Sequence, residues 1–337
     1  MPEKLTAVII GCGDIAGGYD ERGNDPDAVL THAGAYRAHD GFEIVACIEP
    51  DSDRRARFMK FWGIETGFAN LQEWAAADMR CDVVSLCSPS ATHEAALTAL
   101  LETPVRAVFA EKPLTGSPAR SRPVVAQYVK QNRPLAVNYL RRWAPGIVAL
   151  KSEISTGKWG QVRGAMGRYS KGLYNCGSHM IDLMTYLVNP VTPIEVFSSL
   201  TDYSESDPTL SVRLTFENGS PAVMLGSDCG DYFTFELTLV MENGEIDIED
   251  LGLSIRRRTI ESHALFLSQM TPTAGTTSSS GFAQAMVNAV SNIADHINLG
   301  TPLASDGQSA LEAEETCAAI MRLASGNVHG ANKGDAE

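Results

Sequence analysis

The chain has 337 residues, of which 44% are hydrophobic and 20% are charged, a composition typical of a globular protein of about two domains. Its net charge of −14 argues against nucleic acid or an anionic membrane as a partner. No apolar run approaches the roughly 20 residues of a membrane span, and an early strand-like segment leaves no room for a signal peptide. The seven cysteines are scattered without a CxxC pair, which favours a reducing compartment, so we expect a cytoplasmic protein.

A glycine-rich loop directly follows the first strand-like segment and has the pattern Gly11-x-Gly13-x-x-Ala16. In a dinucleotide-binding loop, the first glycine makes the tight turn from strand to helix, and the second lets the backbone approach the pyrophosphate. The third small residue lets the helix pack on the strand. The pattern also fits an ordinary glycine-rich turn, but its position after an N-terminal strand favours the dinucleotide site.

Strand and helix patterns alternate through residues 1–138, which predicts an α/β fold with a doubly wound parallel sheet. We expect strands at residues 7–10, 43–49, 83–88, 107–110 and 135–138, and helices near residues 31–39, 51–61, 91–101 and 117–132. In such a fold, a ligand binds at the carboxyl ends of the strands.

An acidic residue, Glu49, ends the second predicted strand, but it lies further along than the roughly 20 positions usual after the glycine loop. We interpret the extra residues 17–30 as a loop inserted before or within the first crossover helix, either solvated or close to the cofactor. A carboxylate at Glu49 can accept both ribose hydroxyls of NAD and would repel the 2′-phosphate of NADP. Arg54 and Arg55 would soften this preference, which still favours NAD.

The pattern changes after residue 139. We expect helices at residues 145–156, 175–188, 282–297 and 306–325, and a strand at residues 162–170. Alternating apolar residues at 210–216 and 233–241, with Asn-Gly turns between strands, predict an antiparallel meander with one apolar face. Its polar face is either solvated or an oligomer interface. The Thr-, Ser- and Gly-rich segment 271–281 is expected to be a flexible loop.

Two segments of the first half suit chemistry. Ser88-Pro89, followed by His93, either lines the ribose next to the nicotinamide or forms an ordinary strand-to-helix connection. Glu111-Lys112-Pro113 follows the strand at 107–110. A lysine at the carboxyl end of a strand can bind a substrate oxygen and stabilise a developing alkoxide, with Glu111 holding it. A surface ion pair is the alternative interpretation.

A third segment runs from Tyr174 to Asp182 in the second half. By helical spacing, Asn175, His179, Asp182 and Tyr186 fall on one face of a helix. A histidine near a helix start, with a carboxylate one turn on, suits acid–base catalysis, because its pKa is near neutral. A satisfied polar network is the alternative. We expect no metal site, because no third His or Cys ligand has a suitable spacing.

The order and spacing of these motifs resemble the Gfo/Idh/MocA family, which includes glucose–fructose oxidoreductase and inositol 2-dehydrogenase. The resemblance covers nearly the whole chain. The segments that carry it are the glycine loop, Ser88-Pro89 with His93, Glu111-Lys112-Pro113, Asn138 to Arg142, Gly177 to Asp182, Gly300 to Pro302, and Asp306-Gly307.

The resemblance implies a Rossmann domain, expected at residues 1–138, and an α/β domain at 139–326 with a large, mostly antiparallel, open-faced sheet. The last helix can pack back on the Rossmann domain, and we expect residues 327–337 to be a flexible tail. The implied assembly is a homodimer or homotetramer. The implied activity is hydride transfer between NAD(P), with NAD favoured, and a hydroxyl or keto carbon of a sugar, cyclitol or sugar derivative, nucleotide-linked sugars included.

In the implied mechanism, Lys112 polarises the substrate oxygen and His179 takes or gives the hydroxyl proton. The expected cofactor contacts are Gly11, Gly13, Asp14, Ile15, Glu49, Ser88, Pro89, His93, Glu111, Lys112 and Asn138. The expected substrate contacts are Tyr174, Asn175, Asp182 and Arg142.

One position departs from the family pattern, because many relatives carry aspartate where this chain has Asn175. An amide does not stabilise an imidazolium as a carboxylate does. Either His179 is a weaker base, or Asp182 or Tyr174 takes over part of the role. Two other functions stay open: a dinucleotide-binding regulator without turnover, and a reductase of a C=N or C=C bond.

Overall fold

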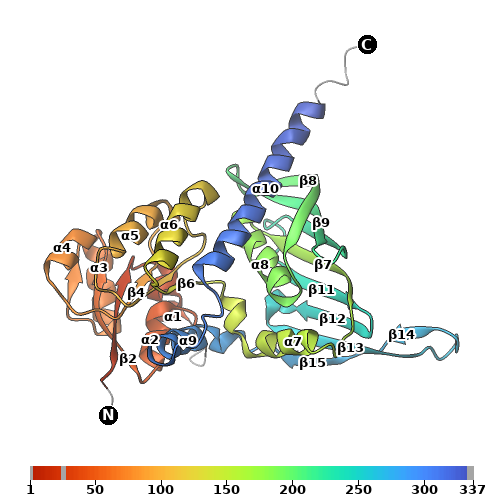
Figure 1. The fold of residues 1–337 in the computed structure, drawn as a ribbon, viewed down its shortest axis with the longest axis horizontal. Coiled ribbons are helices and arrows are strands. Elements are labelled where there is room, and N and C mark those ends of the chain that lie inside the picture. Colours follow the sequence, from red (N-terminus) through yellow and green to blue (C-terminus); the bar gives the residue numbers. More distant parts are fainter. Residues whose placement is uncertain (1–2, 24–27, 332–337) are drawn as a thin grey trace. The chain divides into compact units, whose positions relative to one another are not determined.

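The protein is described by a computed structural model that covers residues 3–23 and 28–331, with side chains described up to residue 326. The chain divides into two compact units (Figure 1). The first unit is Met1–Ala144 together with Ala283–Leu311, and the second unit is Pro145–Phe282 together with Glu312–Glu337.

The first unit is built on a six-stranded sheet with the order β3-β2-β1-β4-β5-β6. Its strands are β1 (Leu5–Ile10), β2 (Phe42–Ile48), β3 (Gly67–Phe68), β4 (Val83–Leu86), β5 (Ala107–Ala110) and β6 (Leu135–Val137). All of their pairings are parallel. The strand order reverses its direction between β1 and β4. Open α/β sheets bind their ligands at this switch point, at the carboxyl ends of the strands. This confirms the predicted doubly wound sheet.

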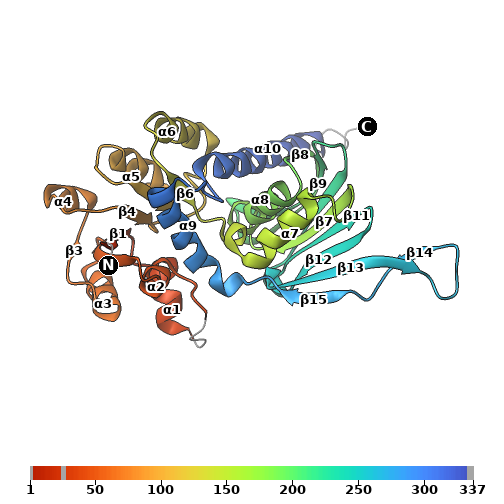
Figure 2. The same ribbon diagram turned by 60° about the horizontal axis from the view of Figure 1, so that its bottom comes forward.

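Helices cover both sides of this sheet, with α2 and α3 on one side and α5 and α6 on the other (Figure 2). The helices of the unit are α1 (Tyr19–Arg22), α2 (His32–Ala38), α3 (Ser52–Trp62), α4 (Leu71–Ala76), α5 (His93–Leu100), α6 (Pro118–Lys130) and α9 (Ala285–Leu299). The predicted insertion 17–30 falls within the first crossover, before α2, but it is not all loop: residues 17–18 belong to a π-helical turn and residues 19–22 form α1. Its residues 24–27 lie outside the described residues. Helix α9 ends at Gly300 in a left-handed conformation (φ +73°), as expected for a helix C-cap.

The second unit holds a nine-stranded sheet with the order β14-β13-β12-β11-β7-β10-β9-β8, and β15 pairs with β13. The strands are β7 (Val162–Ser170), β8 (Val191–Ser204), β9 (Asp207–Phe216), β10 (Pro221–Ser227), β11 (Phe235–Met241), β12 (Gly244–Glu249), β13 (Ser254–Ser262), β14 (Met270–Pro272) and β15 (Thr276–Ser279). The sheet is mostly antiparallel, as predicted. The prediction of a simple meander is wrong at one place, because β7 lies between β10 and β11 and runs parallel to β10.

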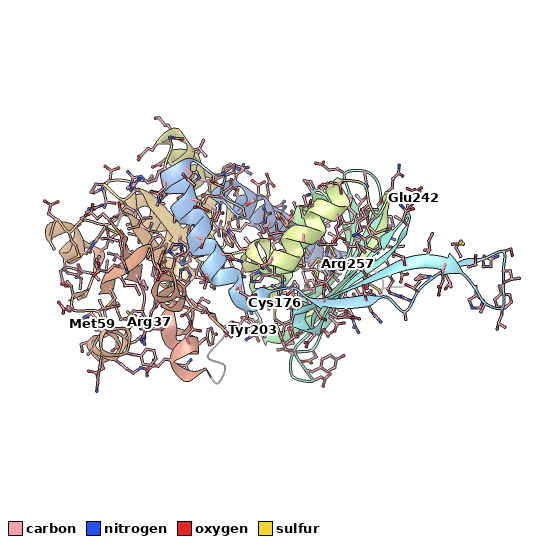
Figure 3. The ribbon with its side chains drawn as sticks, turned by 90° about the horizontal axis from the view of Figure 1, so that it is seen from below. Arg37, Met59, Cys176, Tyr203, Glu242 and Arg257 are labelled. Carbon is pink, nitrogen blue, oxygen red and sulfur yellow. The ribbon has the colours of Figure 1, made fainter. Side chains whose placement is uncertain are left out.

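One face of this sheet is covered by helices α7 (Pro145–Ser155) and α8 (Ser178–Leu187) (Figures 1 and 2). Close packing needs Gly167 of β7, since a methyl group there would lie 2.8 Å from the Met180 sulfur of α8. Arg257 of β13 donates to Glu153 of α7 over 3.1 Å, which ties helix and sheet together (Figure 3). The opposite face carries ion pairs between neighbouring strands, such as Arg168–Glu236 and Arg213–Glu195.

The expectation of a flexible loop at 271–281 is wrong for most of that segment. Residues Met270–Pro272 and Thr276–Ser279 form β14 and β15, which both pair with β13. A Thr- and Ser-rich composition does not prevent pairing when an edge strand offers unpaired N–H and C=O groups. At the end of the chain, α10 (Gly307–Ala331) takes in residues 327–331 of the predicted tail, and residues 332–337 lie outside the described part. No helix within the described ranges is long and apolar enough to cross a membrane.

Candidate functional site

The glycine loop lies at the carboxyl end of β1, and its two glycines differ in what surrounds them. Gly11 has φ +86°, and its N–H donates to the Ile48 carbonyl over 2.8 Å. A Cβ atom at Gly11 would lie 2.7 Å from the Ser88 backbone nitrogen, so only glycine fits between β1 and the end of β4. At Gly13 (φ −83°), a Cβ atom would meet no described atom within 4 Å. Gly13 therefore borders open space, as a loop that receives a pyrophosphate must.

A π-helical turn, Asp14–Gly18, continues the loop after Gly13. The N–H of Gly17 donates to the Gly13 carbonyl over 3.2 Å. Ala16 is fully buried, and a Cβ atom on Gly17 would lie 2.3 Å from the Trp62 indole nitrogen of α3. Ala16, the third fingerprint position, thus lies in the core, and Gly17 lets the turn pack closely against α3.

A pocket of about 290 Å³ adjoins the glycine loop, and its lining residues are Cys12, Gly13, Asp14, Asp51, Asp53, Arg54 and Arg57. Beside it, the Glu49 carboxylate is 5% exposed and accepts hydrogen bonds from the backbone N–H groups of Cys12 (3.0 Å) and Asp51 (3.1 Å). Arg54 lies 3.5 Å from the same carboxylate. Glu49, directly after β2, is therefore held beside this pocket by Cys12 and Asp51, two residues of its lining.

His93 is buried and joins the two loops that follow β4 and β5. Its Nε2 lies 2.8 Å from the Ser88 carbonyl, and its Nδ1 lies 3.0 and 2.8 Å from the carbonyls of Pro113 and Leu114. The ring thus braces the Ser88-Pro89 segment against the segment after Lys112. This arrangement gives His93 a role in fixing the loop positions.

Glu111, at the end of β5, is buried and accepts three hydrogen bonds. His32 Nε2 (3.0 Å) and Asn138 Nδ2 (2.7 Å) lie against Oε1, and the Lys112 N–H lies 3.3 Å from Oε2. Burial alone would raise the pKa of Glu111. The hydrogen bonds from His32 and Asn138, together with the nearby charge of Lys112, outweigh it and hold the pKa below its ordinary value. The half-buried Lys112 thus follows an ionised carboxylate whose direction is fixed.

Asn138, directly after β6, holds a buried acceptor that the described residues leave without a donor. Its Oδ1 is buried and has no hydrogen-bond partner among the described residues. Since a buried carbonyl oxygen without a donor costs free energy, an N–H or O–H group of a bound molecule would fit there. The open space at Gly13, the pocket beside Glu49 and this oxygen all belong to the first unit, and together they fit a dinucleotide.

In the second unit, Tyr174 and Asn175 lie in a π-helical turn, Leu173–Gly177, that leads into α8. Asp207 accepts the N–H groups of Tyr174 (2.7 Å) and Asn175 (3.0 Å), so its carboxylate caps this turn. The preceding Gly172 has φ +84°, and a Cβ atom there would lie 2.3 Å from Asp207. The Asn175 amide nitrogen donates back to the Lys171 carbonyl over 3.1 Å.

His179 and Asp182 of α8 differ in exposure. His179, in the first turn, is half-buried, whereas Asp182 is buried, with 2% of its surface exposed. Burial, with nearby Cys317 and the carboxylates of Glu314 and Asp207, raises the pKa of Tyr174 to about 12. Tyr174 is therefore a neutral phenol at neutral pH, which can donate a proton but is a poor base.

A second acidic group of this unit is structural. Asp202 of β8 accepts hydrogen bonds from the backbone N–H groups of Lys171 (2.9 Å) and Cys229 (3.0 Å) and from the Thr209 hydroxyl (2.6 Å). The Lys171 ammonium lies 5.6 Å from the ring centre of Tyr203, which Figure 3 labels. Asp202 and Asp207 thus fix the segment before α8 from two sides.

The expected site residues fall into two sets. The expected cofactor residues, Lys112 and Arg142 belong to the first unit, whereas Tyr174, Asn175, His179 and Asp182 belong to the second. Arg142 is buried and donates to the Ala304 carbonyl over 3.3 Å. The sequence analysis missed His32 and Asp207, whose partners are distant in the chain. An isolated histidine or aspartate carried no local signal for them.

Comparison with known proteins finds a family model that matches the N-terminal part of the chain. Residues 5–139 match the Gfo/Idh/MocA model, described as an oxidoreductase family with an NAD-binding Rossmann fold. D-apiose dehydrogenase of Paraburkholderia graminis is 25% identical over 245 residues, which are 67% of this chain and 60% of that protein. Inositol 2-dehydrogenase of Corynebacterium glutamicum is 26% identical over 236 residues, 65% of this chain and 66% of that protein. The matches thus span slightly less than two thirds of these relatives.

Solved structures share the fold over the whole chain. The WlbA dehydrogenase of Bordetella pertussis, in complex with NADH and UDP-GlcNAcA, has a TM-score of 0.79 and 16% identity and covers 97% of both chains. Levoglucosan dehydrogenase, in complex with NADH and levoglucosan, has a TM-score of 0.76 and 15% identity, with 96% of this chain and 98% of that chain covered. Residues 5–139, which hold the whole parallel sheet, thus match the model of the Gfo/Idh/MocA oxidoreductase family.

Proposed function

We propose that the chain is an NAD-dependent oxidoreductase that transfers a hydride between nicotinamide and a hydroxyl-bearing carbon of a sugar or cyclitol. The observation that carries this proposal is the placement of Lys112 in the same unit as a complete dinucleotide loop, directly after the buried Glu111. The names of the relatives, an apiose and an inositol dehydrogenase, support the substrate class.

The first unit supplies the cofactor contacts in this proposal. The backbone beside Gly13 receives the pyrophosphate, Glu49 binds the adenosine ribose, and Asn138 Oδ1 accepts from the nicotinamide end. Ser88 and Pro89 follow β4 at the switch point and line the same edge of the sheet. When bound, NAD supplies the carbon that accepts or gives the hydride.

The charges around the pocket favour NAD over NADP. The lining includes the carboxylates of Asp14, Asp51 and Asp53, against the guanidinium groups of Arg54 and Arg57. The Glu49 carboxylate lies beside this lining and accepts the Cys12 N–H. Arg54 is paired with Glu49 and Asp51, and Arg57 is paired with Glu21 at 3.3 Å. A 2′-phosphate would therefore meet an excess of negative charge.

In the chemical step, Lys112 donates to the substrate oxygen and stabilises the negative charge that develops there. His179, in the first turn of α8, takes or gives the hydroxyl proton. Asn175 stands where many relatives have aspartate, and Tyr174 is a neutral phenol, so we assign substrate hydrogen bonding to both and the proton transfer to His179 alone. Asp182 is buried, so we assign it a role in holding α8 in place. Arg142 donates to the Ala304 carbonyl, and we assign it a structural role.

The domains have separate tasks in this proposal. Residues 1–138 bind the cofactor, whereas residues 139–326 hold the substrate and build a cytoplasmic homodimer or homotetramer. The open face of the second sheet supports the assembly, since a hollow of about 370 Å³ there includes Met166, which is 47% exposed. Light scattering that finds only monomers at micromolar concentration would contradict the assembly.

The experiment is NADH formation by the wild type, Lys112→Ala and Lys130→Ala over a panel of sugars, cyclitols, sugar acids and nucleotide sugars, with NADP in parallel. Lys130 is an exposed lysine of the same unit, so its variant is the matched control. We expect turnover with one substrate class and NAD, a loss of about 100-fold or more in Lys112→Ala, and none in Lys130→Ala.

The other outcomes identify the alternatives. Reduction of imines or enoyl compounds alone would change the bond that reacts. NAD binding without turnover on any substrate, together with a specific protein partner, would favour a regulator, with Asn175→Asp as the variant that tests whether activity returns. Equal activity of Lys112→Ala and wild type would remove the role assigned to Lys112.

A further inference from the structure

Four buried polar side chains of the first unit form a hydrogen-bonded chain that ends at Glu111. The hydroxyl of Tyr36 lies 2.8 Å from Ser85 Oγ, and Ser85 Oγ lies 2.9 Å from His32 Nδ1. His32 Nε2 then lies 3.0 Å from Glu111 Oε1. All four residues are buried. Tyr36 and His32 lie in α2, and Ser85 lies in β4, the strand beside β5.

When the His32 ring is neutral, the donors and acceptors of these four side chains are all satisfied in one direction. An ionised carboxylate only accepts, so Nε2 of His32 carries the hydrogen that it shares with Glu111. Nδ1 is then able to accept the Ser85 hydroxyl hydrogen, and Ser85 accepts that of Tyr36. In this direction every donor of the chain is used, and each hydrogen bond points toward Glu111.

The helix that carries His32 is anchored at its start. Thr31 caps α2 by accepting the Gly34 N–H (3.1 Å), and its own hydroxyl donates to Asp20 of α1 (2.5 Å). The His32 ring packs against Phe109 of β5, with ring centroids 4.4 Å apart. The position of the imidazole is therefore set by α1, by the cap of α2 and by the strand that ends at Glu111.

Stability alone does not account for this chain, since buried polar groups replaced by apolar ones of similar shape often leave stability unchanged. What this hydrogen-bonded chain does provide is a fixed orientation of the Glu111 carboxylate, beside Lys112. We propose that His32 is a positioning residue, which clamps Glu111 with Asn138 and thereby orients Lys112 toward the reacting oxygen. This proposal rests on the proposed function for the measurements of kcat and KM, whereas the labelling of Lys112 does not depend on it.

The test compares His32→Leu, His32→Gln and Tyr128→Phe with the wild type. Leucine removes both hydrogen bonds, whereas the glutamine amide can still donate to Glu111. Tyr128→Phe is the control, because it removes another buried hydrogen bond of the first unit, to the Leu97 carbonyl (2.9 Å), far from Glu111 in the network. The readouts are kcat, KM, the Kd of NAD, and the rate at which acetic anhydride labels Lys112 relative to the exposed Lys130.

We expect His32→Leu to lower kcat about 10-fold to 100-fold with the Kd of NAD within about twofold, since misplacement of a catalytic group acts on the chemical step. The relative labelling of Lys112 should change by about threefold or more. His32→Gln should recover most of kcat, and Tyr128→Phe should match the wild type in all four readouts.

Wild-type kcat and wild-type labelling of Lys112 in His32→Leu would overturn the proposal. Failure of His32→Gln to recover more than His32→Leu, at equal thermal stability, would also overturn it, because the hydrogen bond to Glu111 would then not matter. If the wild type turns over no substrate, the proposed function fails, while the labelling of Lys112 still decides whether His32 positions it.

Discussion

Two glycines of the same loop carry different constraints at the residue scale. Gly11→Ala puts a Cβ atom against the Ser88 backbone at a φ of +86°, so we expect the free energy of unfolding to fall by more than about 1 kcal/mol. Gly13 has φ −83° and open space, so alanine should keep the stability within about 1 kcal/mol. It should nevertheless weaken NAD binding about 10-fold or more, because the methyl group occupies the space of the pyrophosphate.

Urea denaturation and calorimetric titration with NAD measure these two effects separately. Equal stability of Gly11→Ala and Gly13→Ala would contradict the packing argument. Tight NAD binding by a folded Gly13→Ala variant would contradict the placement of the pyrophosphate.

Glu111 gives a pH dependence with a definite sign. Its pKa is lowered in the folded protein, so its contribution to stability is present above the unfolded pKa of about 4.3 and is lost as the pH falls through the folded value. In Glu111→Gln, we expect the free energy of unfolding to fall less steeply than in the wild type below about pH 4.5. The matched control is Glu94→Gln, whose side chain is 43% exposed. Parallel curves for Glu111→Gln and wild type would contradict the ionised, hydrogen-bonded carboxylate.

Motif residues were predictable at this scale because local sequence signals them. The glycine loop, Glu49 at a strand end and Glu111 after β5 all stand where the strand-and-helix pattern places them. His32, Tyr36 and Ser85 were not predictable as a chain, since the hydrogen bonds join residues up to 79 positions apart. Nothing in the neighbouring sequence distinguishes them from ordinary buried side chains.

At the scale of elements, long segments with a clear period were predictable and short or edge elements were not. The strands predicted at 107–110 and 162–170 coincide with β5 and β7. The two-residue β3 and the helix α4 are too short to show a period. The parallel pairing of β7 with β10 depends on contacts between distant strands, and the pairing of β14 and β15 depends on the free edge of β13, so neither follows from composition.

Asn292 shows how a late helix is attached to the first unit. Its Oδ1 accepts from the Trp143 indole N–H (2.9 Å) and the Ala304 N–H (2.9 Å), and its Nδ2 donates to the Pro302 carbonyl (3.0 Å). We expect Asn292→Ala to lower the free energy of unfolding by about 1–3 kcal/mol, because it leaves the partly buried indole donor without an acceptor. Asn292→Asp keeps the acceptor and should lose less.

The check is urea denaturation followed by tryptophan fluorescence, at neutral pH. An unchanged midpoint for Asn292→Ala would show that the contacts of α9 do not depend on this side chain. A larger loss in Asn292→Asp than in Asn292→Ala would contradict the acceptor role of Oδ1.

At the scale of the whole molecule, the chain leaves the first unit after Ala144 and returns to it at Ala283. The sequence predicted a helix at 282–297, but the pattern does not say to which unit that helix belongs. The same limit applies to the candidate site, whose residues divide between the two units. The sequence could name Lys112 and His179 through a family resemblance, whereas composition and periodicity alone could not.

The central claim is that a hydride passes from a substrate carbon to NAD with the help of Lys112. The most direct measurement is a single-turnover experiment with a sugar or cyclitol that carries deuterium on the reacting carbon, with the NADH analysed by mass spectrometry. The account predicts deuterium in the NADH of the wild type, and a rate at least about 100-fold lower in Lys112→Ala at saturating NAD. NADH without deuterium, or equal rates in the two proteins, would contradict it.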